Sequence, residues 1–188
     1  MEIISPIPSR GGRIPNARLG LLMTGVIIAV VAFLGIRSID WFLLKKSLKH
    51  RFPKVEWIST QELADWLGSK DRPQPLLLDV RTPAEWNVSH LPGARRVDPS
   101  APVETAAAGV AKETPIVTYC AVGYRSGDLA TRLRAAGFTN VRNLEGSIFE
   151  WANEHRPLVH DDQPVKIVHP YNALWGRLLA DDVRAPLK

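Results

Sequence analysis

The sequence predicts an α/β domain with a mainly parallel sheet, because short apolar strands alternate with helical segments over about a hundred residues. The stretch Leu76–Val80 supports this fold class, since a continuous apolar strand of this kind is buried on both faces in a parallel sheet. The composition, with 45% hydrophobic and 23% charged residues, is typical of a globular protein. A parallel sheet flanked by helices is therefore the expected architecture.

The expected strands follow from short apolar runs bounded by turn residues. They cover residues 55–58, 76–80, 95–97, 115–119 and 140–144. The first helix is expected after Ser59, which forms a capping box with Glu62, and it should end at Gly68. A second, short helix is expected after the cap residue Thr82, with Pro83 at its first position.

Three further helices complete the expected domain. Residues 101–111 are rich in alanine and predict a weakly specified helix. Ser126 is the expected cap of a helix that runs to Ala136 and is closed by Gly137. The last helix is expected at Ser147–Asn153, so strands and helices alternate through the whole domain.

Residues 19–36 form an uncharged apolar run that predicts one membrane-spanning helix. As a helix, eighteen residues span about 27 Å, close to the roughly 30 Å of a bilayer core. A buried core helix would carry more polar residues on one face, and a cleaved signal peptide would be followed by an A-x-A site. We therefore expect an anchor that contacts membrane lipid through residues 19–36.

The charge is distributed unevenly along the chain. Residues 1–54 carry nine Lys and Arg against two acids, whereas residues 55–188 carry 15 basic and 17 acidic residues. A nucleic-acid-binding surface across the larger part is therefore not expected. Three arginines precede the apolar run and six basic residues follow it, so the positive-inside rule predicts a single-pass membrane protein with its C-terminal domain on the cytoplasmic side.

The chain is expected to divide into five parts. These are a basic tail (1–18), the membrane helix (19–36), a basic juxtamembrane segment (37–54), the α/β domain (55–157) and a C-terminal extension (158–188). The extension is punctuated by proline, and we expect it to strap onto the domain.

Cys120 is the single cysteine, which excludes an intramolecular disulfide and a multi-cysteine metal site. The five histidines show no ligand spacing, so neither a metal nor another cofactor is expected. A lone cysteine is either a small buried apolar residue or a reactive thiolate. Its neighbours decide between the two.

The loop Cys120–Ser126 connects a predicted strand to a predicted helix, where open α/β folds place their ligands. Loop N–H groups, the helix N-terminus and Arg125 would each lower the pKa of the thiol. Gly123 allows a tight loop conformation that other residues disfavour. We therefore expect Cys120 to be a nucleophile.

Three segments in order resemble the rhodanese family over residues 55–157. They are LLLDVRTPAEWNVSHLPGA (76–94), CAVGYRS (120–126) and GFTNVRNLEGSIFEWANEHRPL (137–158). The departures are Leu91, where the family commonly has isoleucine, and Gly146-Ser147, where it commonly has two glycines.

The resemblance implies a sulfurtransferase without a cofactor. Cys120 would take the outer sulfur of a small anionic donor such as thiosulfate, carry it as a persulfide, and pass it to a thiol, a cyanide-like acceptor or a protein acceptor. The substrate-binding loop would consist of Ala121, Val122, Gly123, Tyr124, Arg125 and Ser126. By the same resemblance Asp79 and Arg81 support the pocket, although for these two residues and for Glu85 fixing loops through hydrogen bonds and ion pairs is at least as good a role.

Three alternatives remain open from the sequence. Related cysteine phosphatases place arginine six positions after cysteine, whereas Arg125 comes five after Cys120, which disfavours a phosphatase. The domain could instead be a membrane-tethered docking or regulatory module without turnover. Redox sensing by a low-pKa thiol is the third alternative, weakened because the chain has no second cysteine.

Overall fold

The computed structural model describes residues 40–187. Within that range no helix has the length and apolar character needed to cross a membrane. The predicted basic tail (1–18) and membrane helix (19–36) lie outside the described residues.

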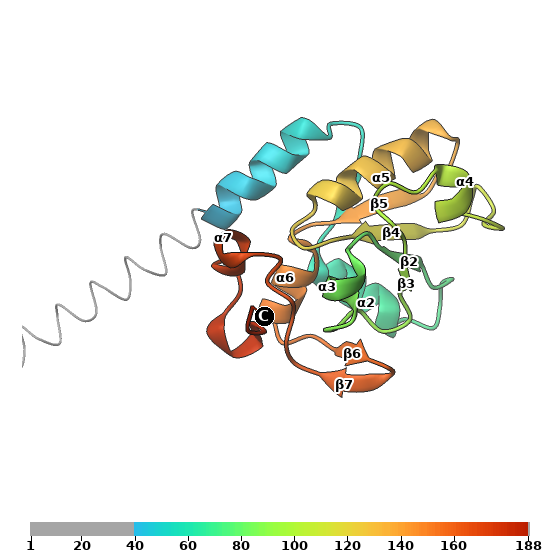
Figure 1. Ribbon diagram of the computed structural model, residues 1–188. Helices are drawn as coiled ribbons and strands as arrows, with labels where there is room; N and C mark the ends of the chain where they lie inside the picture. The colour runs from blue at the N-terminus through green and yellow to red at the C-terminus, as the bar shows by residue number, and fades with distance from the viewer. Residues whose placement is uncertain (1–39, 188) are drawn as a thin grey trace, which may run out of the picture. The chain divides into compact units, whose positions relative to one another are not determined.

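A five-stranded parallel sheet forms the centre of the molecule, with the strand order β1-β5-β4-β2-β3 (Figure 1). The strands are β1 (Glu56–Ile58), β2 (Leu76–Asp79), β3 (Arg95–Arg96), β4 (Ile116–Tyr119) and β5 (Val141–Leu144). In the register, Leu77 of β2 lies beside Val117 of β4. The predicted fold class, α/β with a mainly parallel sheet, is confirmed.

Helices cover both faces of the sheet. They are α2 (Thr60–Gly68), α3 (Pro83–Trp86), α4 (Val103–Ala106), α5 (Tyr124–Ala135) and α6 (Ser147–Asn153). The capping box predicted at Ser59 and the N-cap predicted at Thr82 are both present, Thr82 forms a capping box with Glu85, and Pro83 begins α3. Gly137 follows Ala136, the C-cap of α5, and has a φ of +90°, as expected for the residue that closes a helix.

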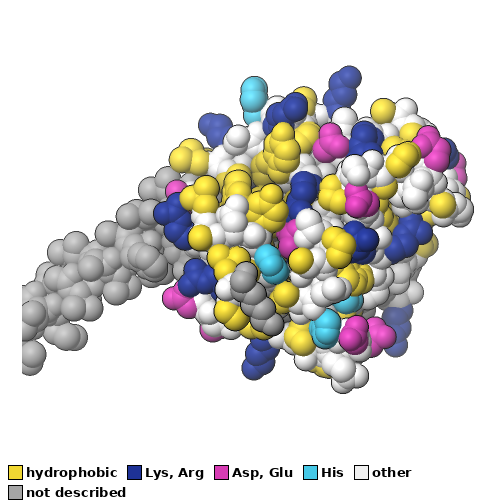
Figure 2. Space-filling model, in the orientation of Figure 1, with side chains coloured by type: hydrophobic (Ala, Val, Ile, Leu, Met, Phe, Trp, Pro, Cys, Tyr) yellow, Lys and Arg dark blue, Asp and Glu magenta, His cyan; other side chains and the backbone are white. Residues whose placement is uncertain are grey.

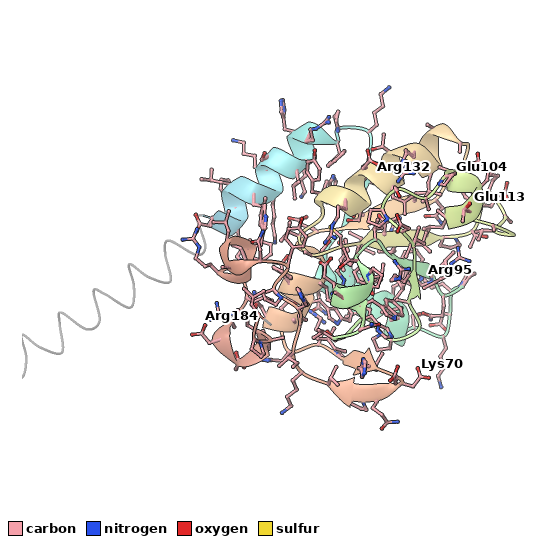
Figure 3. All side chains as sticks on the ribbon, viewed as in Figure 1. Lys70, Arg95, Glu104, Glu113, Arg132 and Arg184 are labelled. Atoms are coloured by element: carbon pink, nitrogen blue, oxygen red, sulfur yellow. The ribbon has the colours of Figure 1, made fainter. Side chains whose placement is uncertain are left out.

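Two helices differ from the sequence prediction. Helix α5 begins at Tyr124 and not after Ser126, because Gly123 takes a left-handed conformation and becomes the N-cap. Helix α4 is a single turn, since it has no side-chain cap and Gly109 turns the chain with a φ of +72°. Arg132 of α5 also fixes this region in an irregular path by donating to the carbonyl oxygens of Pro99 and Ala101 (Figure 3).

Two hydrophobic clusters lie on the two faces of the sheet. One contains side chains of α2, α6 and the C-terminal extension, including Leu63, Phe149 and Leu179. The other contains side chains of α5 and its neighbours, including Leu129 and Leu133. The sheet is therefore the middle layer of three, and its carboxyl edge remains available for loops that carry side-chain chemistry.

Residues 40–51, expected only as a basic juxtamembrane segment, are helical and pack onto the domain. Leu48 and the following Phe52 are buried in the same cluster as α5. Lys45 lies 2.5 Å from Glu150, and Lys49 lies 2.7 Å from Glu145. Part of the positive charge assigned to the membrane flank therefore faces carboxylates of this same domain.

The C-terminal extension contains a hairpin of β6 (Leu158–His160) and β7 (Gln163–Val165), followed by α7 (Ala173–Gly176) and a 3-10 turn (Asp181–Val183). Asn153 of α6 donates to the carbonyl of Leu178 and accepts from the N–H of Ala180, both at 2.8 Å. The extension is held against the domain by these bonds and by its own buried side chains.

Candidate active site

Cys120 follows the last residue of β4 and is 1% exposed. Its backbone N–H donates to the hydroxyl of Ser147 at 3.2 Å, and its carbonyl accepts from the N–H of Ile148 at 3.2 Å. The N–H of Gly123 donates to the sulfur at 3.2 Å. The closing segment of the domain thus fixes the cysteine backbone, while the loop stabilises charge on its sulfur.

A buried polar network holds the loop in shape. Asn143 of β5 donates from Nδ2 to the carbonyl of Gly123 at 2.9 Å, and the Thr118 hydroxyl lies 3.2 Å from Asn143 Oδ1. Gly123 has a φ of +113°, a conformation that disfavours any side chain. Asn143 was not predicted as a site residue; its signal was a polar residue inside an otherwise buried strand.

Ser147 also has an unusual backbone, with a φ of +50°. Its hydroxyl accepts from the Cys120 N–H and donates to the carbonyl of Leu144 at 3.2 Å. A left-handed non-glycine residue costs about 1–3 kcal/mol unless its surroundings compensate. The replacement of the usual second glycine by serine therefore adds a hydrogen bond to the reactive cysteine at a strained position.

Arg125 forms a bidentate ion pair with Glu85 of α3. Its two terminal nitrogens lie 2.8 Å and 2.7 Å from the two carboxylate oxygens. The Glu85 side chain is 1% exposed, whereas that of Arg125 is 22% exposed and reaches the pocket. The sequence analysis allowed Glu85 a loop-fixing role through ion pairs but did not predict its pairing with Arg125, because the two residues are forty positions apart.

The electrostatics favour a thiolate. Burial raises the pKa of Cys120. The lowering effects of Arg125, of the hydroxyl and N–H of Ser126 and of the N–H of Gly123 together exceed the effect of burial, so the pKa lies below its usual value. Burial also raises the pKa of Glu85, but the hydrogen bonds and charge of Arg125, together with the hydrogen bonds from Thr82, lower it by more. The pKa of Glu85 is therefore below its usual value. At neutral pH the site therefore holds an ionised Glu85–Arg125 pair beside a thiol that ionises readily.

The sulfur opens onto a pocket of about 150 Å³. Its lining consists of Cys120, Ala121, Val122, Tyr124, Arg125, Tyr171 and Trp175. The last two come from the C-terminal extension, and the guanidinium of Arg125 lies 5.0 Å from the Tyr171 ring centroid. Nothing in their local sequence indicated a role at this site, because the contact depends on how the extension folds back.

A family model of the rhodanese-like domain matches residues 59–154, just over half of the chain. The chain belongs to the rhodanese-like domain family. This segment holds the Cys120 loop, Glu85, Asn143 and Ser147, and it ends before the extension begins.

Named relatives of this rhodanese-like chain include sulfurtransferases. The probable adenylyltransferase/sulfurtransferase MoeZ of Mycobacterium tuberculosis is 35% identical over 107 residues, which are 55% of this chain but 26% of MoeZ. A sulfurtransferase of Allochromatium vinosum is 32% identical over 105 residues, covering 56% of this chain and 95% of that protein. The crystal structure of Alr3790 from Anabaena aligns with a TM-score of 0.51 at 26% identity, covering 55% and 80% of the two chains.

The rhodanese-like loop brings most of the predicted site residues together. Ala121, Val122, Tyr124 and Arg125 line the pocket with Cys120. Gly123 and Ser126, predicted to bind substrate, do not line it. Gly123 contributes through its N–H on the sulfur, and Ser126, which is fully buried, lowers the pKa of Cys120 through its hydroxyl and N–H.

Asp79 and Arg81, predicted to support the pocket, are not among its lining residues. Both side chains are 0% exposed, and Arg81 Nη2 donates to Asp79 at 2.7 Å and to the Ser89 carbonyl at 2.6 Å. They therefore fix the segment after β2, which is the structural alternative considered from the sequence. Among residues 40–187 no group of His, Cys, Asp and Glu side chains is arranged to hold a metal ion.

Proposed function

We propose that this rhodanese-like protein is a sulfurtransferase that works through a persulfide on Cys120. The observation that carries the proposal is the buried, charge-stabilised sulfur at the base of a small pocket, with the N–H of Gly123 3.2 Å away. Sulfurtransferases among its relatives support the reaction class.

The reaction follows from the groups around the sulfur. The Cys120 thiolate attacks the outer sulfur of a sulfane-sulfur donor, of which thiosulfate is the simplest. A new sulfur–sulfur bond forms on Cys120 while the donor's sulfur–sulfur bond breaks, and its electron pair leaves with sulfite. A thiol or cyanide-like acceptor, small or carried by a protein, then attacks the terminal sulfur and releases the thiolate.

The loop supplies stabilisation at both stages. Backbone N–H groups at the start of α5 and the partial positive charge of its N-terminus stabilise the thiolate. The same groups lie beside the terminal sulfur of the persulfide, so the enzyme need not reorganise between the two half-reactions. Arg125, held by Glu85, keeps its guanidinium at the pocket wall.

We further propose that residues 19–36 anchor the protein in a membrane, with the domain at its cytoplasmic side. The uncharged eighteen-residue run and the basic residues on either side support this arrangement. Retention in the membrane fraction after alkaline carbonate washing, lost on deletion of residues 19–36, is the expected result. Release of the intact chain by carbonate would contradict it.

The function is tested by incubating the purified full-length protein with thiosulfate and measuring the intact mass. We expect an increase of one sulfur atom that a thiol reductant removes. Because the chain has a single cysteine, Cys120→Ala must abolish the increase, and Cys120→Ser is the matched variant that keeps a hydrogen-bonding side chain. Failure of thiosulfate and of persulfide donors alike to add sulfur would overturn the proposal.

A further inference from the structure

Tyr171 and Trp175 form a wall of the Cys120 pocket that the family segment does not supply. Both residues line the pocket, and both lie beyond residue 154, where the match to the rhodanese-like domain ends. Figure 2 shows hydrophobic side chains gathered on the side of the molecule where α7 and the 40–51 helix lie in Figure 1. The Cys120 pocket is thus completed by aromatic rings from a separate part of the chain.

The surrounding structure fixes this aromatic wall in place. Asn172 caps α7, its side-chain oxygen accepting from the Trp175 N–H at 3.0 Å. Gly176 allows the tight packing of α7, because a Cβ at this position would come within 2.7 Å of the Pro170 ring. Arg184 donates to the carbonyl of Gly176 at 3.1 Å (Figure 3). The aromatic side chains are therefore carried by an ordered segment.

The pocket offers no unpaired positive charge. Both terminal nitrogens of Arg125 donate to Glu85, the Cys120 thiolate adds a negative charge, and the other lining side chains are apolar or aromatic. An inorganic dianion that enters this site loses hydration without gaining an unpaired cation, which is unfavourable. A neutral molecule with a small organic group pays no such cost and gains contact with the aromatic rings.

We propose that Tyr171 and Trp175 are specificity-determining residues that bind the organic group of a small hydropersulfide, R–S–SH, and favour it over thiosulfate. This inference rests on the proposed sulfurtransferase function. The Cys120 thiolate attacks the outer sulfur, the Sγ–S bond forms, and the donor's S–S bond breaks with its electron pair leaving on R–S⁻. The proton stays on the transferred sulfur, and no oxidant or reductant is needed.

The size of the pocket agrees with a small organic donor. Its volume of about 150 Å³ equals the share of roughly five water molecules in the liquid. The transferred sulfur, the inner sulfur and the first carbons of R fit in such a space, with the rest of a low-molecular-weight carrier extending past Tyr171, which is 45% exposed.

The test compares two donors on the full-length protein in mild detergent. Ethyl hydropersulfide, whose organic group is uncharged, and thiosulfate are each mixed with the enzyme, and the rate at which one sulfur is added to Cys120 is measured by mass spectrometry. We expect Tyr171→Ala and Trp175→Ala each to lower the hydropersulfide rate about tenfold and the thiosulfate rate less than about twofold. The ratio of the two rates is the readout, because a general loss of structure lowers both.

Matched variants sharpen the comparison. Leu174→Ala removes a neighbouring side chain of α7 that is 60% exposed and does not line the Cys120 pocket, so it should leave the ratio unchanged. Tyr171→Phe keeps the ring and should also leave it unchanged. Glu85→Gln removes the countercharge of Arg125 and should shift the ratio towards thiosulfate.

The inference would be overturned if Tyr171→Ala and Trp175→Ala left the ratio of hydropersulfide rate to thiosulfate rate unchanged. The sulfurtransferase function would then still stand. Absence of loading from either donor in the wild-type protein would instead overturn the function itself.

Discussion

Arg81–Asp79 and Arg125–Glu85 are both hydrogen-bonded arginine–carboxylate pairs near the carboxyl edge of the sheet, but they differ in exposure. Both members of the first pair are 0% exposed. In the second pair the Glu85 side chain is 1% exposed and that of Arg125 is 22% exposed. The first pair is sealed within the protein, whereas the second has one member at the wall of the Cys120 pocket.

This difference separates a structural role from a chemical one. The Asp79–Arg81 pair joins the end of β2 to the carbonyl of Ser89 and contacts no lining group of the pocket through its charges. Arg125 lowers the pKa of Cys120, and Glu85 holds the Arg125 side chain in place. Two experiments test this contrast and two more test the residues that hold the Cys120 loop, beginning with the largest expected effect.

Asp79→Asn should destabilise the fold by about 3–5 kcal/mol, because it leaves the buried Arg81 guanidinium without its countercharge. Urea unfolding measures the loss. The double variant Asp79→Leu, Arg81→Met removes both charges and should recover much of the stability. A folded, stable Asp79→Asn protein with lost sulfur transfer would instead give this pair a role in chemistry.

Arg125→Met should slow persulfide formation about 10²–10³-fold, the usual effect of losing one charge-stabilising donor. It should also move the pH profile of Cys120 alkylation to higher pH. The sign follows from the lowered pKa of Cys120: the reactive thiolate is present above this pKa and is lost as pH falls through it. An unchanged alkylation profile would show that Arg125 does not stabilise the Cys120 thiolate.

Asn143→Ala should cost about 1–3 kcal/mol of stability, since the buried carbonyl of Gly123 and hydroxyl of Thr118 lose a partner. Because this carbonyl lies in the loop, sulfur transfer should also fall by about tenfold in the fraction that remains folded. Asn143→Asp is the matched variant, since it keeps the shape but places a carboxylate against the loop that carries Cys120. The added charge should raise the pKa of Cys120 and move its alkylation profile to higher pH. An unshifted profile would contradict the placement of the residue 143 side chain against the Cys120 loop.

Ser147→Gly should have the smallest effect. The loss of the hydroxyl from the Cys120 N–H and the relief of backbone strain oppose one another, so stability should change by less than about 1 kcal/mol. Ser147→Ala keeps the strain and loses the hydroxyl, and its unfolding midpoint should therefore be the lower of the two. The reverse order would show that the left-handed backbone at residue 147 carries no cost.

The sequence was most informative where local signals and tertiary structure agree. The capping box at Ser59 and the N-cap at Thr82 depend on neighbouring residues only, and both were predicted correctly. The apolar strands predicted the parallel sheet, and the only cysteine with its following arginine indicated the loop that the structure places at the sheet edge.

What the sequence could not supply were contacts between residues distant in the chain. Glu85 and Arg125 are forty positions apart, and each has a simpler local interpretation. Tyr171 and Trp175 reach Cys120 only because Asn153 and Leu179 fix the extension on the domain. Ser126 was a reasonable helix cap by residue type, but Gly123 starts the helix earlier because it accepts a left-handed backbone.

The packing of Phe52 determines where the domain can be truncated. The ring lies so close to Gly127 that an added Cβ would approach it within 2.7 Å, and it meets the Tyr124 ring edge-on at 5.7 Å. A fragment that starts at residue 59, where the family match begins, would lack Phe52 and Leu48 and leave an apolar face of α5 uncovered. The boundary of the recognisable family and the boundary of the folding unit are therefore different, and the second lies no later than the 40–51 helix.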